Sequence, residues 1–206
     1  EFACPSLTAL DDSPLIELIG IVTQPDRPKG RQLIPHPPAV KVESERRKLT
    51  VHQPLRLRND FVFLNKLNPD LIVVVAYGQI LPQPILELPK YGCINVHGSL
   101  LPLYRGAAPI QRAILDGQNK TGVTIMEMET GLDTGPMISK METQIESNDN
   151  AQTLHDRLAN LGAKLLVDTI PQYVTGKIKS IPQDDTQSSH ASKITREMGQ
   201  IDWTKT

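Results

Sequence analysis

The stretch DLIVVVAYGQILPQPILELPKYGCINVHGSL, residues 70–100, decides the fold class of this chain. Its first part, residues 70–76, is a continuous apolar run of the kind found in parallel strands covered on both faces, which predicts a place at the centre of a sheet. A short helix is predicted over residues 83–88, and a second strand over residues 93–99. A strand, a helix and a second strand in this order are typical of an α/β domain.

The second strand carries two polar side chains among apolar ones. Ile94 and Val96 alternate with Asn95 and His97. Because successive side chains of a strand point to opposite faces, Asn95 and His97 are expected to share one face. They lie where the strand gives way to a loop containing Gly and Pro, and burying two polar groups there costs free energy unless they are used.

The flanking sequence continues the alternation of strands and helices. Strands are predicted over residues 16–23, near Val51, and over residues 122–128 and 136–145; helices are predicted over residues 39–48, 59–67 and 107–116. A further helix places Leu154, Leu158, Leu161 and Leu165 on one stripe, behind a cap at Asp149 or Asn150. The expected fold is a doubly wound, Rossmann-like α/β domain, with a mostly parallel sheet flanked by helices. Its ligand site should lie outside the carboxyl ends of the strands.

Both ends of the chain depart from this pattern. Residues 2–12, FACPSLTALDD, have helical character, although a doubly wound fold normally begins with a buried strand before its first helix. We therefore expect a first strand to be missing. From about residue 177 onward the chain is polar and loses periodicity, which predicts a linker.

Composition indicates an ordinary globular protein. Hydrophobic residues make up 39% of the 206 and charged residues 22%, which argues against a disordered or fibrous class. The longest apolar run is too short to cross a bilayer, and no signal peptide is evident, so we expect no membrane partner. A cytoplasmic location is expected, or an organellar matrix in a eukaryote. Cys4 and Cys93 form no disulfide framework or metal-ligand spacing.

Positive charge is concentrated early in the chain. Residues 25–58 contain nine Lys or Arg against three Asp or Glu. Residues 24–38 contain five prolines and one glycine and are predicted to form a long loop. Its Arg27, Lys29 and Arg31 are the better candidates for binding a polyanion. A solvated helix face explains residues 46–48 equally well.

Asp133 is the third candidate for chemistry. It lies in TGLDTGP, residues 130–136, where an Asp is by default a turn former that binds nearby backbone. A hydrolase triad of Ser99, His97 and Asp133 is disfavoured, because there is no Gly-x-Ser-x-Gly turn and the Ser lies two residues beyond the His. The histidines and cysteines form no metal-ligand pair, and the glycines form no phosphate loop. We therefore expect neither a metal nor a nucleotide cofactor.

Two long motifs resemble one family. INVHGSLLPLYRGAAPIQRAI, residues 94–114, and GVTIMEMETGLDTGPM, residues 122–137, closely resemble the methionyl-tRNA formyltransferase family. Three shorter motifs resemble the same family: TQPDRP (23–28), VVAYGQILP (74–82) and IDW (201–203). The resemblance spans nearly the whole chain.

The resemblance implies a formyltransferase fold and a one-carbon transfer. The formyl group of 10-formyltetrahydrofolate would pass to the amino group of methionine on initiator tRNA, in translation initiation, and the enzyme is expected to be a monomer. Asn95 and His97 would stabilise the oxyanion, while Asp133 would orient His97 and hold a water that relays a proton. Predicted folate contacts are Ser99, Leu100, Leu101, Pro102, Tyr77, Gly78, Ile80 and Leu81.

The resemblance also implies a domain plan. Residues 1–178 would be the catalytic domain, and residues 179–206 a linker toward a C-terminal β-barrel domain. The loop at 24–38 resembles a loop that inserts into tRNA, with Arg31 the best single candidate for a contact, although it is shorter than the usual pattern.

Other functions remain open from the sequence. A formyltetrahydrofolate hydrolase or dehydrogenase domain and a sugar-nucleotide formyltransferase would share Asn-x-His and the distant Asp, but the GAAPIQ helix start and the TQPDRP loop favour the tRNA enzyme. A non-catalytic RNA-binding fragment is the alternative of a different class.

Overall fold

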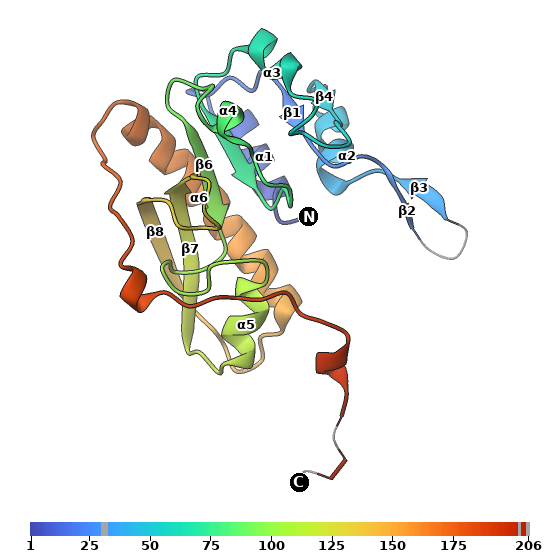
Figure 1. Ribbon diagram of the computed structural model, residues 1–206, viewed down its shortest axis with the longest axis vertical. Helices are drawn as coiled ribbons and strands as arrows, with labels where there is room; N and C mark the ends of the chain where they lie inside the picture. The colour runs from blue at the N-terminus through green and yellow to red at the C-terminus, as the bar shows by residue number, and fades with distance from the viewer. Residues whose placement is uncertain (30–32, 202, 205–206) are drawn as a thin grey trace.

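The structure is a computed structural model that describes residues 1–206 except 30–32, 202 and 205–206 (Figure 1). The helices are α1 (Cys4–Asp11), α2 (Ala39–Arg46), α3 (Val62–Leu67), α4 (Gln83–Leu86), α5 (Pro109–Leu115) and α6 (Ala151–Val174). The strands are β1 (Ile21–Val22), β2 (Arg27–Lys29), β3 (Ile34–His36), β4 (Val51–His52), β5 (Ile72–Val75), β6 (Cys93–His97), β7 (Lys120–Glu127) and β8 (Met137–Gln144).

The principal sheet has the strand order β5-β6-β7-β8. β5 and β6 are parallel, whereas β7 and β8 extend the sheet in antiparallel fashion. β1 and β4 form a separate parallel pair. Helices cover these strands, so the predicted α/β class is confirmed (Figure 1).

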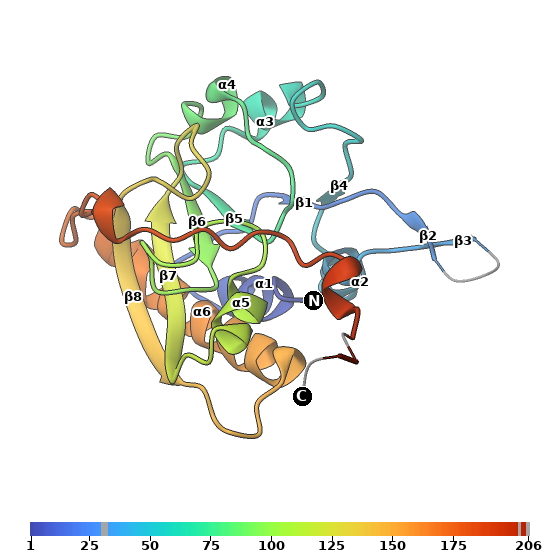
Figure 2. The ribbon, with the colours of Figure 1, turned by 60° about the horizontal axis from the view of Figure 1, so that its bottom comes forward.

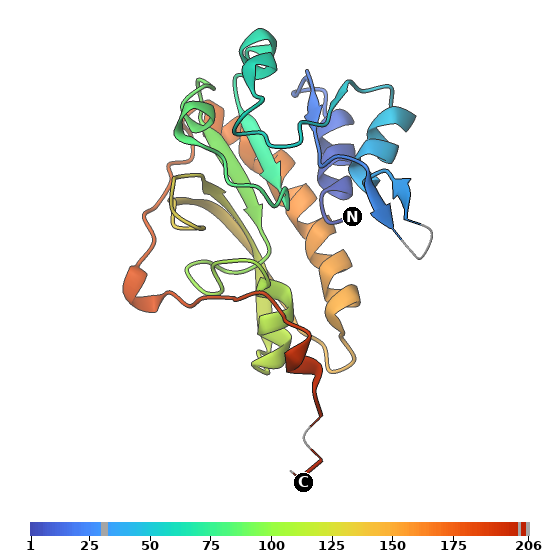
Figure 3. The same cartoon turned by 45° about the vertical axis from the view of Figure 1, so that its right-hand side comes forward.

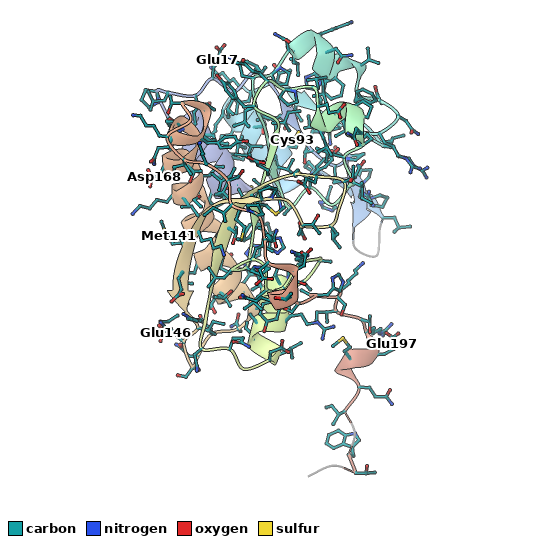
Figure 4. The ribbon with its side chains drawn as sticks, turned by 60° about the vertical axis from the view of Figure 1, so that its left-hand side comes forward. Glu17, Cys93, Met141, Glu146, Asp168 and Glu197 are labelled. Atoms are coloured by element: carbon teal, nitrogen blue, oxygen red, sulfur yellow. The ribbon has the colours of Figure 1, made fainter. Side chains whose placement is uncertain are left out.

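β6 separates two parts of the hydrophobic core. Ile94 and Val96 have at most 3% of their surface exposed and pack in the cluster that includes the buried leucines of α6. Cys93, labelled in Figure 4, begins β6 and packs with Leu64 of α3 and Ile85 of α4. Asn95 and His97 therefore lie on a strand that is anchored by core packing on both sides.

The long helix α6 runs along the sheet beside α1 (Figure 3). Its buried leucines include Leu154 and Leu158, both with no exposed surface, which confirms the predicted stripe. Of the two predicted caps, Asn150 is the correct one: its side chain accepts hydrogen bonds from the backbone N–H groups of residues 152 and 153. An N-cap of this kind typically stabilises a helix by about 1 kcal/mol.

β5 lies at the edge of the principal sheet, so its predicted central position is wrong for the strands that the structure describes. A cavity of about 670 Å³ separates β5 from β1 and is lined mainly by apolar side chains, among them Ile21, Val22, Val73 and Val75. Each of the two strands pairs on one side only. The apolar run at residues 70–76 indicates that both faces of the strand are covered, but it does not indicate whether both edges are paired. The prediction of a central position failed for this reason.

The Pro-rich stretch at residues 24–38 contains a hairpin where a loop was predicted. β2 and β3 are antiparallel, and Pro28 lies opposite Pro35. Proline is tolerated in a strand only where no ladder hydrogen bond is required of it, and a two-stranded ribbon has two such edges. Residues 30–32 lie outside the described part of the chain.

The segment after α6 turns back along the sheet. Ile181 and Met137 exchange two backbone hydrogen bonds of 2.8 Å, and Ala191 is fully buried. Figure 2 shows the segment crossing the ends of β7 and β8 and continuing past α5. We call residues 181–191 the strap. The division at residue 178 stays a prediction, but the strap itself packs on the domain.

Candidate active site

Asn95 and His97 occupy the carboxyl-terminal half of β6. Asn95 is half-buried and pairs in register with Val74 of β5 and Met126 of β7. Among the described residues, no side chain or backbone group forms a hydrogen bond with its amide. That amide is therefore free to bind a reacting group.

His97 is 5% exposed, and its two ring nitrogens have different surroundings. Nε2 lies 2.9 Å from the backbone oxygen of Tyr104, which can only accept, so Nε2 carries a proton and donates. Nδ1 lies 3.6 Å from Oδ2 of Asp133, too far for a direct hydrogen bond but close enough for a bridging water. Nδ1 is therefore the ring nitrogen that remains for chemistry.

Asp133 is brought to His97 by the loop between β7 and β8. Its backbone has φ of 53°, a left-handed conformation that Asp tolerates better than most residues. Oδ2 accepts a hydrogen bond of 2.8 Å from the backbone N–H of Gly106. The turn role expected of such an Asp is thus replaced by a long-range contact, and the structure brings the side chains of His97 and Asp133 together.

The loop after β6 is fixed by hydrogen bonds to β7. The hydroxyl of Thr124 donates to the oxygen of Ser99 (2.7 Å) and accepts from the N–H of Leu101 (3.1 Å). The Ser99 hydroxyl itself donates to the oxygen of Leu103, and the Leu101–Pro102 peptide bond is cis. Ser99 and Leu101 have no exposed surface. Of the four folate contacts predicted in this loop, only Leu100 and Pro102 have side chains that are partly exposed to a ligand. Their contact with folate stays a prediction.

The second predicted folate segment follows β5. Ile80 is 84% exposed, whereas Leu81 is 4% exposed and belongs to the core. Gly78 has φ of 76°, which a side chain would disfavour. Tyr77 is half-buried, and its hydroxyl has no hydrogen-bond partner among the described residues. Burial raises the pKa of this hydroxyl above its usual value. The segment thus combines an exposed apolar side chain with a buried polar group.

A cleft of about 630 Å³ borders this segment. It is lined by Gln24, Arg27, Leu55, Arg56, Arg58, Tyr77, Gly78, Gln79 and Ile80. Arg56 and Arg58 have no acidic partner in the part of the chain that the structure describes. Of the predicted polyanion contacts, Arg27 belongs to this cleft; Arg31 and the side chain of Lys29 lie outside the described residues.

Other early cations are already paired. Arg46 and Arg47 both bind Glu43, and Arg47 also binds Asp11 and Asp12 at 2.7 Å. Hydrogen bonds from the two arginines lower the pKa of Glu43 from 4.5 to about 2. These pairs favour the solvated helix face over a nucleic-acid contact for Arg46 and Arg47. Sequence reasoning counted Arg56 and Arg58 in the basic stretch but gave no reason to single them out.

The described residues offer no site for a metal ion and no membrane span. Among them, no cluster of three His, Cys, Asp or Glu side chains could hold a metal ion. In the same part of the chain, no helix has the length and apolar character that crossing a membrane requires. Burial raises the pKa of the Cys93 thiol to about 12, so this thiol is a packing group and not a nucleophile.

Comparison with known proteins identifies the family of the chain. The sequence profile of the formyl transferase family matches residues 4–170, which include Asn95, His97 and Asp133. The chain belongs to the formyl transferase family. The predicted family resemblance is therefore confirmed at this level.

Several individual proteins of this family are similar to the chain. The whole chain aligns with the methionyl-tRNA formyltransferases of Bacillus velezensis, at 52% identity, and Bacillus subtilis, at 50% identity; it spans 65% of the length of each. The formyltransferase PseJ from Anoxybacillus kamchatkensis, solved with a formamido sugar nucleotide and tetrahydrofolate, is 30% identical with a TM-score of 0.61, over 83% of this chain and 84% of that chain. Phosphoribosylglycinamide formyltransferase from Anaplasma phagocytophilum is 19% identical with a TM-score of 0.73, over 90% and 91%, and shares the fold.

Proposed function

We propose that this chain is the catalytic domain of a methionyl-tRNA formyltransferase. Its formyl donor is 10-formyltetrahydrofolate, and its acceptor is the amino group of methionine on initiator tRNA. The observation that carries the proposal is the approach of His97 Nδ1 to the Asp133 carboxylate, beside an Asn95 amide to which no described residue forms a hydrogen bond. The two Bacillus relatives that bear this name support the choice of acceptor.

Asn95 and His97 act on the charge that develops during transfer. When the amine attacks the formyl carbon, a new C–N bond forms and the formyl oxygen becomes an oxyanion. The Asn95 amide and a protonated His97 Nδ1 donate hydrogen bonds to that oxygen, which they can do without rearrangement because β6 fixes both residues. Removing one preorganised donor of this kind typically slows a reaction about 100- to 1,000-fold.

Asp133 accepts the proton that the amine loses. Oδ2 is engaged by the Gly106 N–H, whereas no described residue forms a hydrogen bond with Oδ1. Oδ1 therefore accepts the amine proton, directly or through a water, while the bond from carbon to the folate nitrogen breaks and that nitrogen takes up a proton. Carboxylate and imidazole together supply the acid and base that these two steps require.

Two surfaces flank the reacting groups. We assign the folate to the segments at 77–81 and 99–102, where Ile80, Leu100 and Pro102 offer apolar surface; the bound tetrahydrofolate of PseJ supports a folate donor. We assign phosphates of the tRNA to the cleft lined by Arg27, Arg56 and Arg58. Lys29 and Arg31, from the same basic stretch of the sequence, remain candidates for further tRNA contacts. Guanidinium groups suit phosphate recognition because their planar donors match its oxygens.

A formyl-transfer assay tests the proposal. The protein is incubated with 10-formyltetrahydrofolate and methionyl initiator tRNA, and formylated aminoacyl-tRNA and free formate are both measured. Asn95→Ala, His97→Ala and Asp133→Ala are each expected to lose at least about 100-fold in rate. Release of formate without formyl-tRNA would point to a hydrolase. RNA binding that is salt-sensitive but unaccompanied by any transfer would point to a non-catalytic RNA-binding protein.

A second acceptor class has one observation in its favour. PseJ, at 30% identity, was solved with a formamido sugar nucleotide. An amino sugar nucleotide therefore serves as a competing acceptor in the same assay. Faster formylation of the sugar than of methionyl-tRNA would reassign the acceptor while leaving the roles of Asn95, His97 and Asp133 unchanged.

A further inference from the structure

The strap is bonded to the loop that follows β6. The N–H of Arg105 donates to Ser189 (2.9 Å), the N–H of Ala191 donates to Arg105 (2.6 Å), and the N–H of Ala108 donates to Ala191 (3.2 Å). The guanidinium of Arg105 also reaches Asp185 at 2.7 Å. A segment that the sequence describes only as polar is thus fixed to the loop that leads from His97 to α5.

Gln183 is the strap residue that reaches the Asp133 loop. Its Nε2 donates to the backbone oxygens of Asp133 (2.9 Å) and Gly135 (2.7 Å). Its Oε1 accepts from Nε of Arg105 at 2.9 Å. The orientation of the amide is determined by its partners, because a guanidinium can only donate and a carbonyl can only accept. One side chain therefore joins the loops on both sides of the site.

The Asp133 loop has little else to hold it. Its tip is open to solvent, with Leu132 60% exposed, so apolar packing contributes little there. Apart from the Gly106 N–H on the Asp133 carboxylate, the two bonds from Gln183 are the long-range hydrogen bonds that residues 131–135 make among described residues. Asp133 also has a left-handed backbone, a conformation that persists when its surroundings impose it.

We propose that Gln183 is a positioning residue for Asp133. By binding the carbonyls on either side of Thr134, it keeps the carboxylate within reach of His97 Nδ1, so that the strap completes the active site. The inference rests on the catalytic role proposed for Asp133. A purely structural alternative is that Gln183 serves only to attach the strap, through Arg105.

Gln183→Glu separates these two roles. The glutamate retains an oxygen for Arg105, and adds a charge that strengthens that contact, but it cannot donate to the two loop carbonyls. The matched control is Gln187→Glu, since Gln187 lies in the same strap and is exposed, and among described residues its side chain bonds only to Asp184. Gln183→Met removes the donors without adding a charge, and so controls for repulsion between the new carboxylate and the carbonyls.

The full-length protein and each variant are compared by steady-state kinetics, thermal melting and hydrogen–deuterium exchange. For Gln183→Glu we expect kcat to fall about 10- to 100-fold, with KM for the folate within about twofold and the melting temperature unchanged. Amides of residues 131–135 should exchange faster in both Gln183 variants and not in Gln187→Glu. A Gln183→Glu protein with wild-type kcat and wild-type exchange in this loop overturns the inference, as does a loss of stability with no change in the loop.

Combining the change with Asp133→Ala shows whether the effect passes through Asp133. If Gln183 acts by positioning that carboxylate, Gln183→Glu should cost less than about twofold in kcat once the carboxylate is gone, because contacting residues are not additive. An undiminished loss in the Asp133→Ala background overturns the inference. If Asp133→Ala alone retains full activity, the proposed catalytic role fails, and loop exchange still decides whether Gln183 holds the loop.

Discussion

Replacing Gly135 with alanine should move the Asp133 loop without touching the reacting groups. A Cβ built on Gly135 would lie 2.0 Å from the backbone oxygen of Glu127 and 2.9 Å from its carbonyl carbon. Real contacts of this type are essentially never shorter than 3.0 Å, so the two backbones must separate by about 1 Å. Glu127 cannot easily yield, because it lies in β7 and pairs in register with Ile94 of β6.

The loop is therefore the side that moves. A shift of this size stretches the 2.7 Å bond from Gln183 to the Gly135 oxygen and displaces Asp133, two residues away. A misplacement of about 1 Å can cost about 100-fold in rate, and forced overpacking typically costs about 1–3 kcal/mol in stability.

Formyl transfer by Gly135→Ala should thus fall about 100-fold, and urea denaturation should show the loss of stability. Gly199→Ala is the matched control, because nothing lies within 4 Å of the position that its Cβ would take and its backbone is not left-handed. A Gly135→Ala protein with wild-type turnover would refute the reasoning, since it would show that the placement of this loop does not limit catalysis.

Three further outcomes are expected. Leu158→Ala, at a fully buried position of α6, should lower the free energy of unfolding by about 2–5 kcal/mol in urea titrations, whereas Leu115→Ala, 63% exposed, should change it by less than about 0.5 kcal/mol. Glu43 has a folded-state pKa of about 2, below its usual 4.5, so its ion pairs stabilise the protein fully above pH 4.5 and are lost as the pH falls toward 2. The melting temperatures of wild type and Glu43→Gln should therefore converge as the pH approaches 2. Arg58→Ala should weaken tRNA binding uniformly and reduce its salt slope by about one, unlike the ion-paired Arg46→Ala; unchanged slopes would exclude the cleft as a phosphate site.

The strand that carries the site could be predicted because its signal is local. Ile94 and Val96 alternate with Asn95 and His97, and period-two alternation depends only on neighbouring residues. The stripe of leucines in α6 is predictable for the same reason, since burial of one face repeats every three or four residues. These elements match the structure to within a few residues.

Contacts between distant segments could not be predicted in this way. Asp133 looks like a turn residue from its neighbours, and only the family resemblance connects it to His97, 36 positions earlier. The β2–β3 hairpin escapes prediction because prolines usually end strands, and the exposed edges that admit Pro28 and Pro35 are a property of pairing. The edge position of β5 escapes it because apolar character does not report hydrogen-bonded neighbours.

The strap shows most clearly what sequence periodicity cannot predict. Gln183 lies in a run without periodicity, and its importance comes from three partners that are 48 to 78 positions away. Periodicity marks the end of the packed elements at about residue 178, because a helix or strand buries one face in a regular pattern. An active site needs only a few directed hydrogen bonds, and these require no pattern in the chain that supplies them. In this protein the hydrogen bonds that hold the Asp133 loop therefore extend beyond the last periodic element, into a segment whose composition alone describes a linker.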